Sequence, residues 1–229
     1  MKQIFVTATD TDAGKTFVTS ALVRALRQAG HAARAAKPVA CGVEPNGTYG
    51  DVEALLDAQG MKPEEGSEIS CYRFAAPLAP MQAATEEGVS LEPERLVSWC
   101  NDFCKADSLN VIEGVGGLMV PLAPDYLVAD WIADLPDAEI LLVVRSRLGG
   151  INHMLLTLDK LARMGRSPKW IVLNDADGAG AAMLELHREA LPATIAHVAE
   201  VASFPFAGGS GKMRPGEGRL LKMLGAFLR

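Results

Sequence analysis

The sequence predicts a single α/β domain over residues 1–229, built on a mostly parallel sheet flanked by helices. Short apolar runs alternate with helical segments along the chain, and this alternation implies right-handed crossovers between parallel strands. With 229 residues, of which 49% are hydrophobic and 22% are charged, the chain is long and apolar enough to bury one sizeable core. We find no internal repeat and no linker that clearly divides it.

Four apolar runs are typical of strands buried on both faces, and they lie at residues 4–6, 109–112, 138–144 and 170–173. Residues 32–39 are expected to form one further strand, which ends at Lys37-Pro38 because proline cannot continue an interior ladder. Apolar residues at helical spacing follow Gly14, and Gly30 closes this first helix. Further helices are expected near residues 51–58, 92–104, 126–135, 152–164 and 181–191.

The charge balance and the cysteines disfavour several classes of partner and location. The 22 basic and 28 acidic residues leave a net charge of −6, so no overall field attracts nucleic acid or anionic lipid. The apolar stretch after Gln3 is too short for a secretory signal or a membrane span. The four cysteines form no CxxC pair and favour free thiols in a reducing compartment. We therefore expect a cytoplasmic protein with no nucleic-acid or membrane partner.

The strongest local signal is the loop Ala8-Thr9-Asp10-Thr11-Asp12-Ala13-Gly14-Lys15-Thr16, which follows the first strand and opens the first helix. A phosphate-binding P-loop lies at this place in an α/β sheet. Its backbone N–H groups bind phosphate oxygens, the lysine ammonium bridges them, and the threonine hydroxyl can bind Mg²⁺. The loop is a variant of G-x-x-x-x-G-K-[ST], because Thr9 stands where the first glycine belongs. The alternative interpretation is an ordinary capped strand-to-helix turn.

A carboxylate and a glycine-rich turn end another predicted strand, in Val111-Ile112-Glu113-Gly114-Val115-Gly116-Gly117. Ligands of open parallel sheets bind at this edge. We therefore expect Glu113 to lie beside the P-loop threonine, where it could hold Mg²⁺ directly or through water. The glycines would let the backbone approach a ligand closely. The alternative is a simple turn after a core strand.

Other polar residues near the predicted strand ends are weaker candidates. Lys37 could neutralise phosphate or carboxylate oxygens, although taken alone it fits a solvated surface charge. Cys41 and Asp51 are either ligands or ordinary residues of the next loop and helix start. Asn174-Asp175 could satisfy the edge of a base, but an Asx turn explains the pair equally well.

The sequence resembles the dethiobiotin synthetases through most of its length, because six segments appear in the order of that family. The family usually has glycine at the position of Ala8 and serine at that of Cys41, whose thiol is a weaker donor than a hydroxyl. The six segments are Phe5-Val6-Thr7-Ala8-Thr9-Asp10-Thr11 with Gly14-Lys15-Thr16, Lys37-Pro38-Val39-Ala40-Cys41-Gly42, Tyr72-Arg73-Phe74 with Pro77 and Pro80, Glu113-Gly114-Val115-Gly116-Gly117 with Pro121-Leu122, Leu148-Gly149-Gly150-Ile151-Asn152-His153, and Asn174-Asp175.

The resemblance implies a P-loop-type homodimer with its active site near the subunit interface. The implied substrates are 7,8-diaminononanoate, CO₂ or bicarbonate, and ATP, with Mg²⁺ as the metal. CO₂ adds to one amine to give a carbamate, ATP phosphorylates the carbamate, and the second amine attacks the mixed anhydride with loss of phosphate. The products are dethiobiotin, ADP and phosphate.

The resemblance also implies a role for each matching residue. Lys15 bridges the γ-phosphate and the carbamate, while Thr11 and Lys37 hold the carbamate oxygens, so these three are the expected catalytic residues. Thr16, Asp51 and Glu113 surround Mg²⁺. The expected ATP-binding residues are Asp12, Ala13, Gly14, Lys15, Thr16, Phe17, Glu113, Gly114, Gly116, Gly117 and Asn174, the last of which reads the adenine. The expected substrate-binding residues are Thr11, Lys37, Cys41, Leu148, Gly149, Gly150, Ile151 and Asn152.

Two other functions stay open on the sequence. One is a nucleotide switch of the partitioning or septum-positioning kind, which shares the P-loop sheet. The acidic balance, the lack of a lysine early in the loop and the lack of a C-terminal basic amphipathic helix count against it. The other is ATP-dependent ligation of another kind. It would be carried out by an amidotransferase-type cyclic-diamide synthase or its ATPase domain, against which the lack of an appended glutaminase domain counts, or by a different ligase on the same scaffold.

Overall fold

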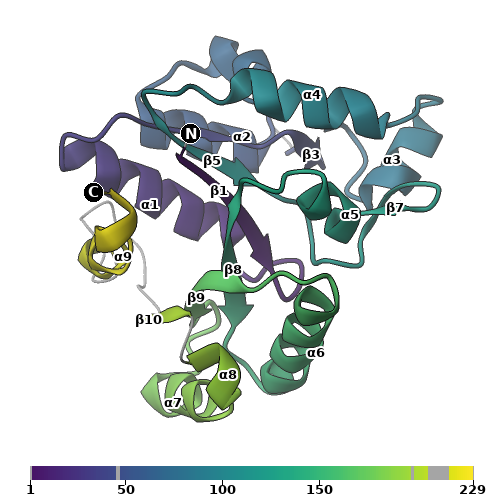
Figure 1. The fold of residues 1–229 in the computed structure, drawn as a ribbon. Helices are drawn as coiled ribbons and strands as arrows, with labels where there is room; N and C mark the ends of the chain where they lie inside the picture. The colour runs from purple at the N-terminus through teal and green to yellow at the C-terminus, as the bar shows by residue number, and fades with distance from the viewer. Residues whose placement is uncertain (1, 45–46, 197–198, 206–216, 229) are drawn as a thin grey trace.

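A six-stranded sheet in the order β10-β9-β8-β1-β5-β2 forms the centre of the computed structural model, which describes residues 2–44, 47–196, 199–205 and 217–228 (Figure 1). Every neighbouring pair in this sheet is parallel. The predicted α/β class with a mostly parallel sheet is therefore confirmed. The strands are β1 Lys2–Ala8, β2 Ala33–Ala36, β5 Leu109–Glu113, β8 Glu139–Arg145, β9 Pro168–Asn174 and β10 Glu200–Phe204.

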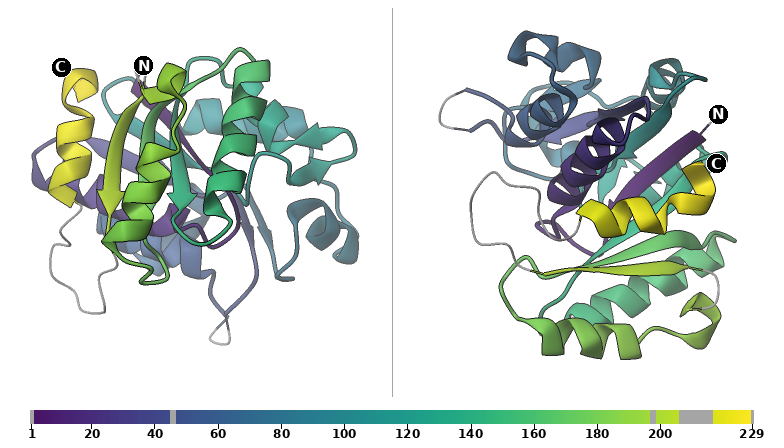
Figure 2. Two further views of the ribbon diagram at one scale, coloured as in Figure 1. Left: turned by 90° about the horizontal axis from the view of Figure 1, so that it is seen from below. Right: turned by 90° about the vertical axis from the view of Figure 1, so that its left-hand side faces the viewer.

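Helices cover both faces of the sheet. Figure 2 shows α1 (Lys15–Gln28) and α9 (Glu217–Met223) on one face, and α6 (Gly150–Arg163) and α7 (Ala181–Glu189) on the opposite face. None of the helices in the described ranges is both long enough and apolar enough to cross a bilayer. The remaining helices are α2 Gly50–Gln59, the 3₁₀ helix Pro63–Glu68, α3 Pro80–Glu86, α4 Pro93–Phe103, α5 Val128–Ala133, α8 Ala193–Ala196 and α10 Gly225–Leu228.

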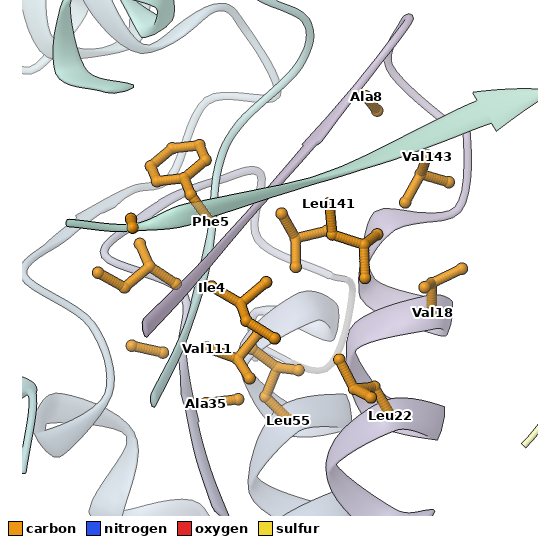
Figure 3. Packing of buried hydrophobic residues seen from close by; sticks show 14 of the residues in the cluster. Ile4, Phe5, Ala8, Val18, Leu22, Ala35, Leu55, Val111, Leu141 and Val143 are labelled. Carbon is orange, nitrogen blue, oxygen red and sulfur yellow. The ribbon is translucent and has the colours of Figure 1, made fainter. Parts of the chain in front are cut away.

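Alternate residues of β1 pack against opposite layers. Ile4 lies between the sheet and α1, close to Leu22 and Val111 (Figure 3). Phe5 points to the other face, where its ring meets Trp131 of α5 edge to face with 4.9 Å between ring centroids. All of these side chains are buried, as expected for a central strand of a parallel sheet. The second buried cluster, between β8–β9 and α6–α8, consists of Leu142, Val144, Met154, Leu158, Ile171, Leu173, Leu184, Ile195 and Ala199.

Two predicted elements differ from the structure. Residues 32–39 are not one strand, because β2 ends at Ala36 and Val39 begins β3 (Val39–Cys41), which pairs with β4 (Tyr72–Phe74) in a separate two-stranded sheet. Pro38 has no N–H to give to the main ladder, and its carbonyl instead accepts from the N–H groups of Cys71 and Tyr72. The chain therefore leaves the sheet at Lys37.

The helix expected at 126–135 is also shorter. Residues Tyr126–Leu127 form β7, which pairs with β6 (Pro121–Ala123), and α5 begins only at Val128. The Asp130 carboxylate accepts the Leu127 N–H at 2.8 Å and so caps this start.

The outer edge of the main sheet is closed by a side chain. Gln59, at the end of α2, accepts the Ala35 N–H at 2.8 Å and donates to the Ala35 carbonyl at 3.0 Å. The amide thus imitates a neighbouring strand along β2. A covered edge offers no row of unpaired groups to a second chain.

Candidate active site

The P-loop joins the end of β1 to the start of α1 at the carboxyl edge of the sheet. Gly14, the residue before α1, has φ 91°, a left-handed conformation that favours glycine. A Cβ at this position would lie 2.2 Å from the side-chain nitrogen of Asn174, so no other residue fits. Thr9, which replaces the first glycine of the usual pattern, accepts the Arg145 N–H through Oγ1 at 3.3 Å. The departure at Thr9 therefore supplies a contact between the loop and β8.

A cavity of about 800 Å³ opens beside this loop. It brings together side chains from β1–α1, β3, α2 and the turn after β5. One part of its lining is polar and charged, and the other is apolar. The lining residues are Thr11, Asp12, Gly14, Lys15, Thr16, Lys37, Cys41, Asp51, Pro77, Leu78, Ala79, Pro80, Val115, Gly116 and Val120.

Lys37 lies at the centre of a buried charge network. Its Nζ is 2.7 Å from Glu113 Oε1 and 2.8 Å from Asp51 Oδ2. Its third partner is the Gly114 carbonyl at 3.3 Å. Only 2% of Lys37 and none of Glu113 is exposed, so this pair is held away from solvent. Taken alone in the sequence, Lys37 fitted a solvated surface charge. In the fold it is a buried residue of the cavity lining that pairs with Glu113 and Asp51.

The two carboxylates keep Lys37 charged. Burial lowers the pKa of Lys37, but the nearby Glu113 and Asp51 outweigh burial and raise this pKa above its usual range. Burial likewise raises the pKa of Asp51, and the Lys37 ammonium outweighs it, so that the Asp51 pKa lies below its usual value. The site therefore holds an ammonium and an ionised aspartate side by side at neutral pH.

Lys15, the P-loop lysine, has a different environment. Its Nζ donates to the Gly116 carbonyl at 2.9 Å, and the residue is 7% exposed. Burial, followed by the neighbouring positive charge of Lys37, lowers the pKa of Lys15 to about 8. The charges of Glu113, Asp51 and Asp12 favour the ammonium but do not outweigh burial and Lys37, which suits a group that meets a polyanionic ligand.

The donor set around Thr16 fits a magnesium ion. The Thr16 hydroxyl lies 2.6 Å from both Asp51 Oδ1 and Glu113 Oε1, yet it has only one proton to donate. Glu113 Oε2 is buried and has no hydrogen-bond partner in the described structure. Within those same residue ranges, no cluster of three or more His, Cys, Asp or Glu side chains could hold a metal by itself. Two carboxylates and a hydroxyl match Mg²⁺, which usually takes its other ligands from water and phosphate.

Some of the predicted site residues line the cavity, and others lie outside its lining. Glu113 lies beneath the lining, in contact with Thr16 and Lys37. Gly114 and Gly117 are small for reasons of packing, because added Cβ atoms would lie 2.9 Å from the Phe5 ring and 3.3 Å from the Ala8 carbonyl. The predicted residues that do not line the cavity are Ala13, Phe17, Glu113, Gly114, Gly117, Leu148, Gly149, Gly150, Ile151, Asn152 and Asn174.

Asn174 and the segment from Leu148 to Asn152 lie outside the cavity lining for different reasons. Asn174 is buried, and its side-chain nitrogen donates to the Ala13 carbonyl at 2.8 Å, so it braces the P-loop. The segment from Leu148 to Asn152 begins α6, and Leu148 at its head is 91% exposed. This segment does not line the cavity of its own chain.

The apolar wall of the cavity was missed by the sequence reasoning. It consists of Pro77, Leu78, Ala79, Pro80, Val115 and Val120. Pairing of β3 with β4 brings the segment after β4 next to Cys41, where the Gly42 N–H donates to the Phe74 carbonyl at 3.0 Å. Burial raises the pKa of the Cys41 thiol to about 11, so it is protonated at neutral pH. The signal for this wall was the pair of prolines at 77 and 80.

The fold and the cavity together define a P-loop nucleotide-binding enzyme. A family model described as "AAA domain" matches residues 2–208. Over 188 residues the chain is 40% identical to the ATP-dependent dethiobiotin synthetase BioD of Methylobacterium nodulans, with 78% of this chain and 83% of that protein covered. It is 43% identical over 175 residues to the BioD protein of Anaeromyxobacter dehalogenans, with 76% and 77% covered. The chain belongs to the dethiobiotin synthetase family, as its six segments predicted.

A solved structure agrees on the fold alone. The signal recognition particle 54 kDa protein of Aeropyrum pernix, solved in complex with GDP, superposes with a TM-score of 0.50 at 14% identity. The match covers 99% of this chain and 47% of that chain. This likeness supports the P-loop sheet and carries no conclusion about substrate.

Proposed function

We propose that this chain closes the ureido ring of dethiobiotin from 7,8-diaminononanoate, CO₂ and ATP. The observation that supports it most directly is Lys37, held between Glu113 and Asp51 at 2.7 and 2.8 Å on the floor of the cavity that Lys15 and Thr11 also line. Joining a carbamate to a phosphate requires two anions to approach each other. A site with two buried ammonium groups suits this task.

The proposed reaction has three steps. One amine nitrogen of the substrate bonds to the carbon of CO₂ and loses a proton, which leaves a carbamate. A carbamate oxygen attacks the γ-phosphorus, and the bond to the ADP oxygen breaks. The second amine then attacks the carbamate carbon, a proton leaves this nitrogen, and phosphate departs as the ring closes.

The chain's contribution is positioning and charge. Lys15 contacts the γ-phosphate and the carbamate, while Thr11 and Lys37 hold the carbamate oxygens. The backbone from Asp12 to Phe17 surrounds the phosphates at the start of α1, where the N–H groups of the helix N-terminus favour anions. Gly116 lines the cavity and lets the turn after β5 approach the nucleotide, while Gly114 and Gly117 keep that turn packed against β1 and Glu113 lies beneath it.

Mg²⁺ would be held by Thr16, Asp51 and Glu113, and when bound it screens the charge of the phosphates. In the structure the charge that balances these carboxylates is the Lys37 ammonium. A divalent cation held there would share the charge of these carboxylates, so the Lys37 ammonium could also hold a carbamate oxygen. Thr16 can then keep its proton for one acceptor.

The apolar wall is suited to the hydrocarbon chain of the diamine, and Cys41 lies where the two parts of the cavity meet. Asn174 is assigned to the adenine. One N–H of its amide donates to the Ala13 carbonyl, and its amide oxygen can accept from the exocyclic amine of adenine.

We further propose that the active unit is a homodimer. The segment from Leu148 to Asn152 does not line its own cavity, which supports a role for it at the substrate carboxylate in a partner's site. The first turn of α6 offers N–H groups for such a carboxylate. Leu148 and Leu156 of this region are 91% and 61% exposed, and Leu186 of the neighbouring α7 is 51% exposed. Exposed apolar side chains of this kind are what an interface between two copies would cover.

The acidic net charge of −6 is consistent with a cytoplasmic enzyme that binds neither nucleic acid nor membrane. The first experiment is phosphate release from Mg-ATP by the purified protein, with and without 7,8-diaminononanoate and bicarbonate, with the product identified by mass. We expect release that depends on the diamine and a ring-closed product. Phosphate release that does not depend on the diamine would instead indicate a nucleotide switch or another ligase.

A further inference from the structure

The first half of the phosphate loop is tied to the chain segment that leads into α6. The Thr9 N–H donates to the Val143 carbonyl at 3.0 Å, and Thr9 Oγ1 accepts the Arg145 N–H at 3.3 Å. These contacts join the loop to the end of β8. They leave the next residue, Asp10, facing the turn between β8 and α6.

Asp10 uses its two carboxylate oxygens for different partners. Oδ1 accepts the backbone N–H of Thr11 at 2.8 Å. Oδ2 accepts from the Arg147 guanidinium at 3.1 Å, and His153 Nδ1 of α6 lies 3.7 Å from the same oxygen. Asp10 does not line the cavity, whereas Thr11 does. The direct route from Asp10 to the cavity therefore passes through Thr11.

Arg147 continues this path into α6. Its carbonyl accepts the Gly150 N–H at 2.9 Å, which places Arg147 one turn before the helix starts. Gly150 itself cannot move freely, because an added Cβ would lie 2.4 Å from the Arg145 carbonyl and 2.5 Å from His187 Nε2. The start of α6 is thus a fixed point, and Asp10 connects the loop to it.

We propose that Asp10 is a positioning residue that holds Thr11 of the phosphate loop in register with the start of α6. The ion pair is half exposed, with 40% of the Arg147 side chain and 38% of the Asp10 side chain accessible, so it contributes little to global stability. Its effect is local. The part of the proposal that concerns turnover rests on the proposed function, in which Thr11 holds the carbamate.

The test uses Asp10→Asn, Arg147→Met and the double variant of the full chain. Asn at position 10 keeps an oxygen for the Thr11 N–H but removes the charge that faces Arg147. The matched control is Arg163→Met, which removes a guanidinium from the far end of α6, where it pairs with Asp159 at 2.7 Å and its side chain is 75% exposed. All variants are expected to have the thermal midpoint of the control.

The first measurement is hydrogen exchange of the backbone amides in the peptide that covers residues 9–14, followed by mass spectrometry. We expect Arg147→Met to accelerate exchange there about threefold or more, because it releases the far end of the tether, while the control leaves it unchanged. This readout needs no substrate. Unchanged exchange in residues 9–14 would overturn the proposal, whether or not the proposed function is right.

The second measurement is kcat/KM for the diamine. We expect each single variant to lower it about tenfold, with a change under about twofold in the Kd of Mg-ADP, since a small displacement of a positioning group is costly to turnover. The double variant should be no worse than the poorer single variant, because both changes cut one tether. Effects that multiply would mean that Arg147 acts through residues 148–152 instead, which contradicts the proposal. A wild-type protein without ring-closed product would refute the proposed function, and the exchange result would still decide the role of Asp10.

Discussion

Lys37 and Glu113 are 76 residues apart in the chain, yet Lys37 Nζ lies 2.7 Å from Glu113 Oε1, and both side chains are buried. Glu113 ends a strand of the main sheet, whereas Lys37 lies between β2 and β3, where the chain leaves that sheet. The pair therefore exists because Pro38 interrupts the edge strand beside β5. Asp51 completes the network from the first turn of α2.

We expect Lys37→Ala to lower turnover by at least about two orders of magnitude, because it removes a preorganised charge from the reacting groups. Phosphate release that depends on the diamine measures this. The control is Lys169→Ala, which removes a lysine that is half exposed and pairs with Glu139 outside the cavity. Near-normal turnover in folded Lys37→Ala would refute the catalytic assignment.

Thr16→Val should raise the Mg²⁺ concentration needed for half-maximal activity about tenfold or more, because a methyl replaces one of three oxygen donors. Titration of phosphate release with free Mg²⁺ at saturating ATP measures the effect. Ser20→Ala is the matched control. Ser20 lies one turn after Thr16 in α1, and its hydroxyl donates to the Ala54 carbonyl of α2. Equal Mg²⁺ dependence in the two variants would contradict the proposed metal site.

Cys41→Ser restores the hydroxyl usual in the family, and we expect activity that is unchanged or higher. The thiol is protonated at neutral pH because burial raises its pKa to about 11, so no thiolate chemistry is lost. The measurement is kcat/KM for the diamine. A large decrease would show that the thiol has a role that a hydroxyl cannot fill.

Nucleotide binding at pH 8 should take up about half a proton. The pKa of Lys15 in the free protein is lowered to about 8, chiefly by burial, so near this pH half of the molecules carry a neutral amine. A bound triphosphate favours the ammonium, and the uptake should disappear below about pH 7, where Lys15 is already charged. Calorimetry in buffers of different ionisation enthalpy measures the proton. Lys15→Arg, whose guanidinium stays charged, should bind nucleotide without this uptake.

Gln59→Ala should lower the free energy of unfolding by about 1–3 kcal/mol, because it leaves the buried N–H and carbonyl of Ala35 without their partner. Urea denaturation measures the difference. Asp57→Ala on the same helix is the control, with a side chain that is 82% exposed, and it should change stability by less than about 0.5 kcal/mol. Equal stability of the two variants would mean that β2 does not need this cover.

Local patterns were enough to predict the class of fold and the family. The strand, loop and helix around Gly14-Lys15-Thr16 appear where expected, because apolar periodicity and glycine placement act over a few residues. The strands β5, β8 and β9 were predicted for the same reason, since a fully buried parallel strand is a continuous apolar run. Thr16, Asp51 and Glu113 were assigned by resemblance, and the structure brings them within hydrogen-bond distance of one another through Thr16.

The sequence by itself determined the alternation of elements, the phosphate loop and the family, because each is written in short stretches of chain. Only the tertiary structure decided that residues 32–39 divide into two strands, that Lys37 is buried between two carboxylates, and that Pro77 to Pro80 form the apolar wall. It also placed Asn174 against the P-loop and left the start of α6 outside the lining of the cavity. These features depend on contacts between residues far apart in the chain, and no local periodicity encodes which distant partner a strand edge or a charged side chain will meet.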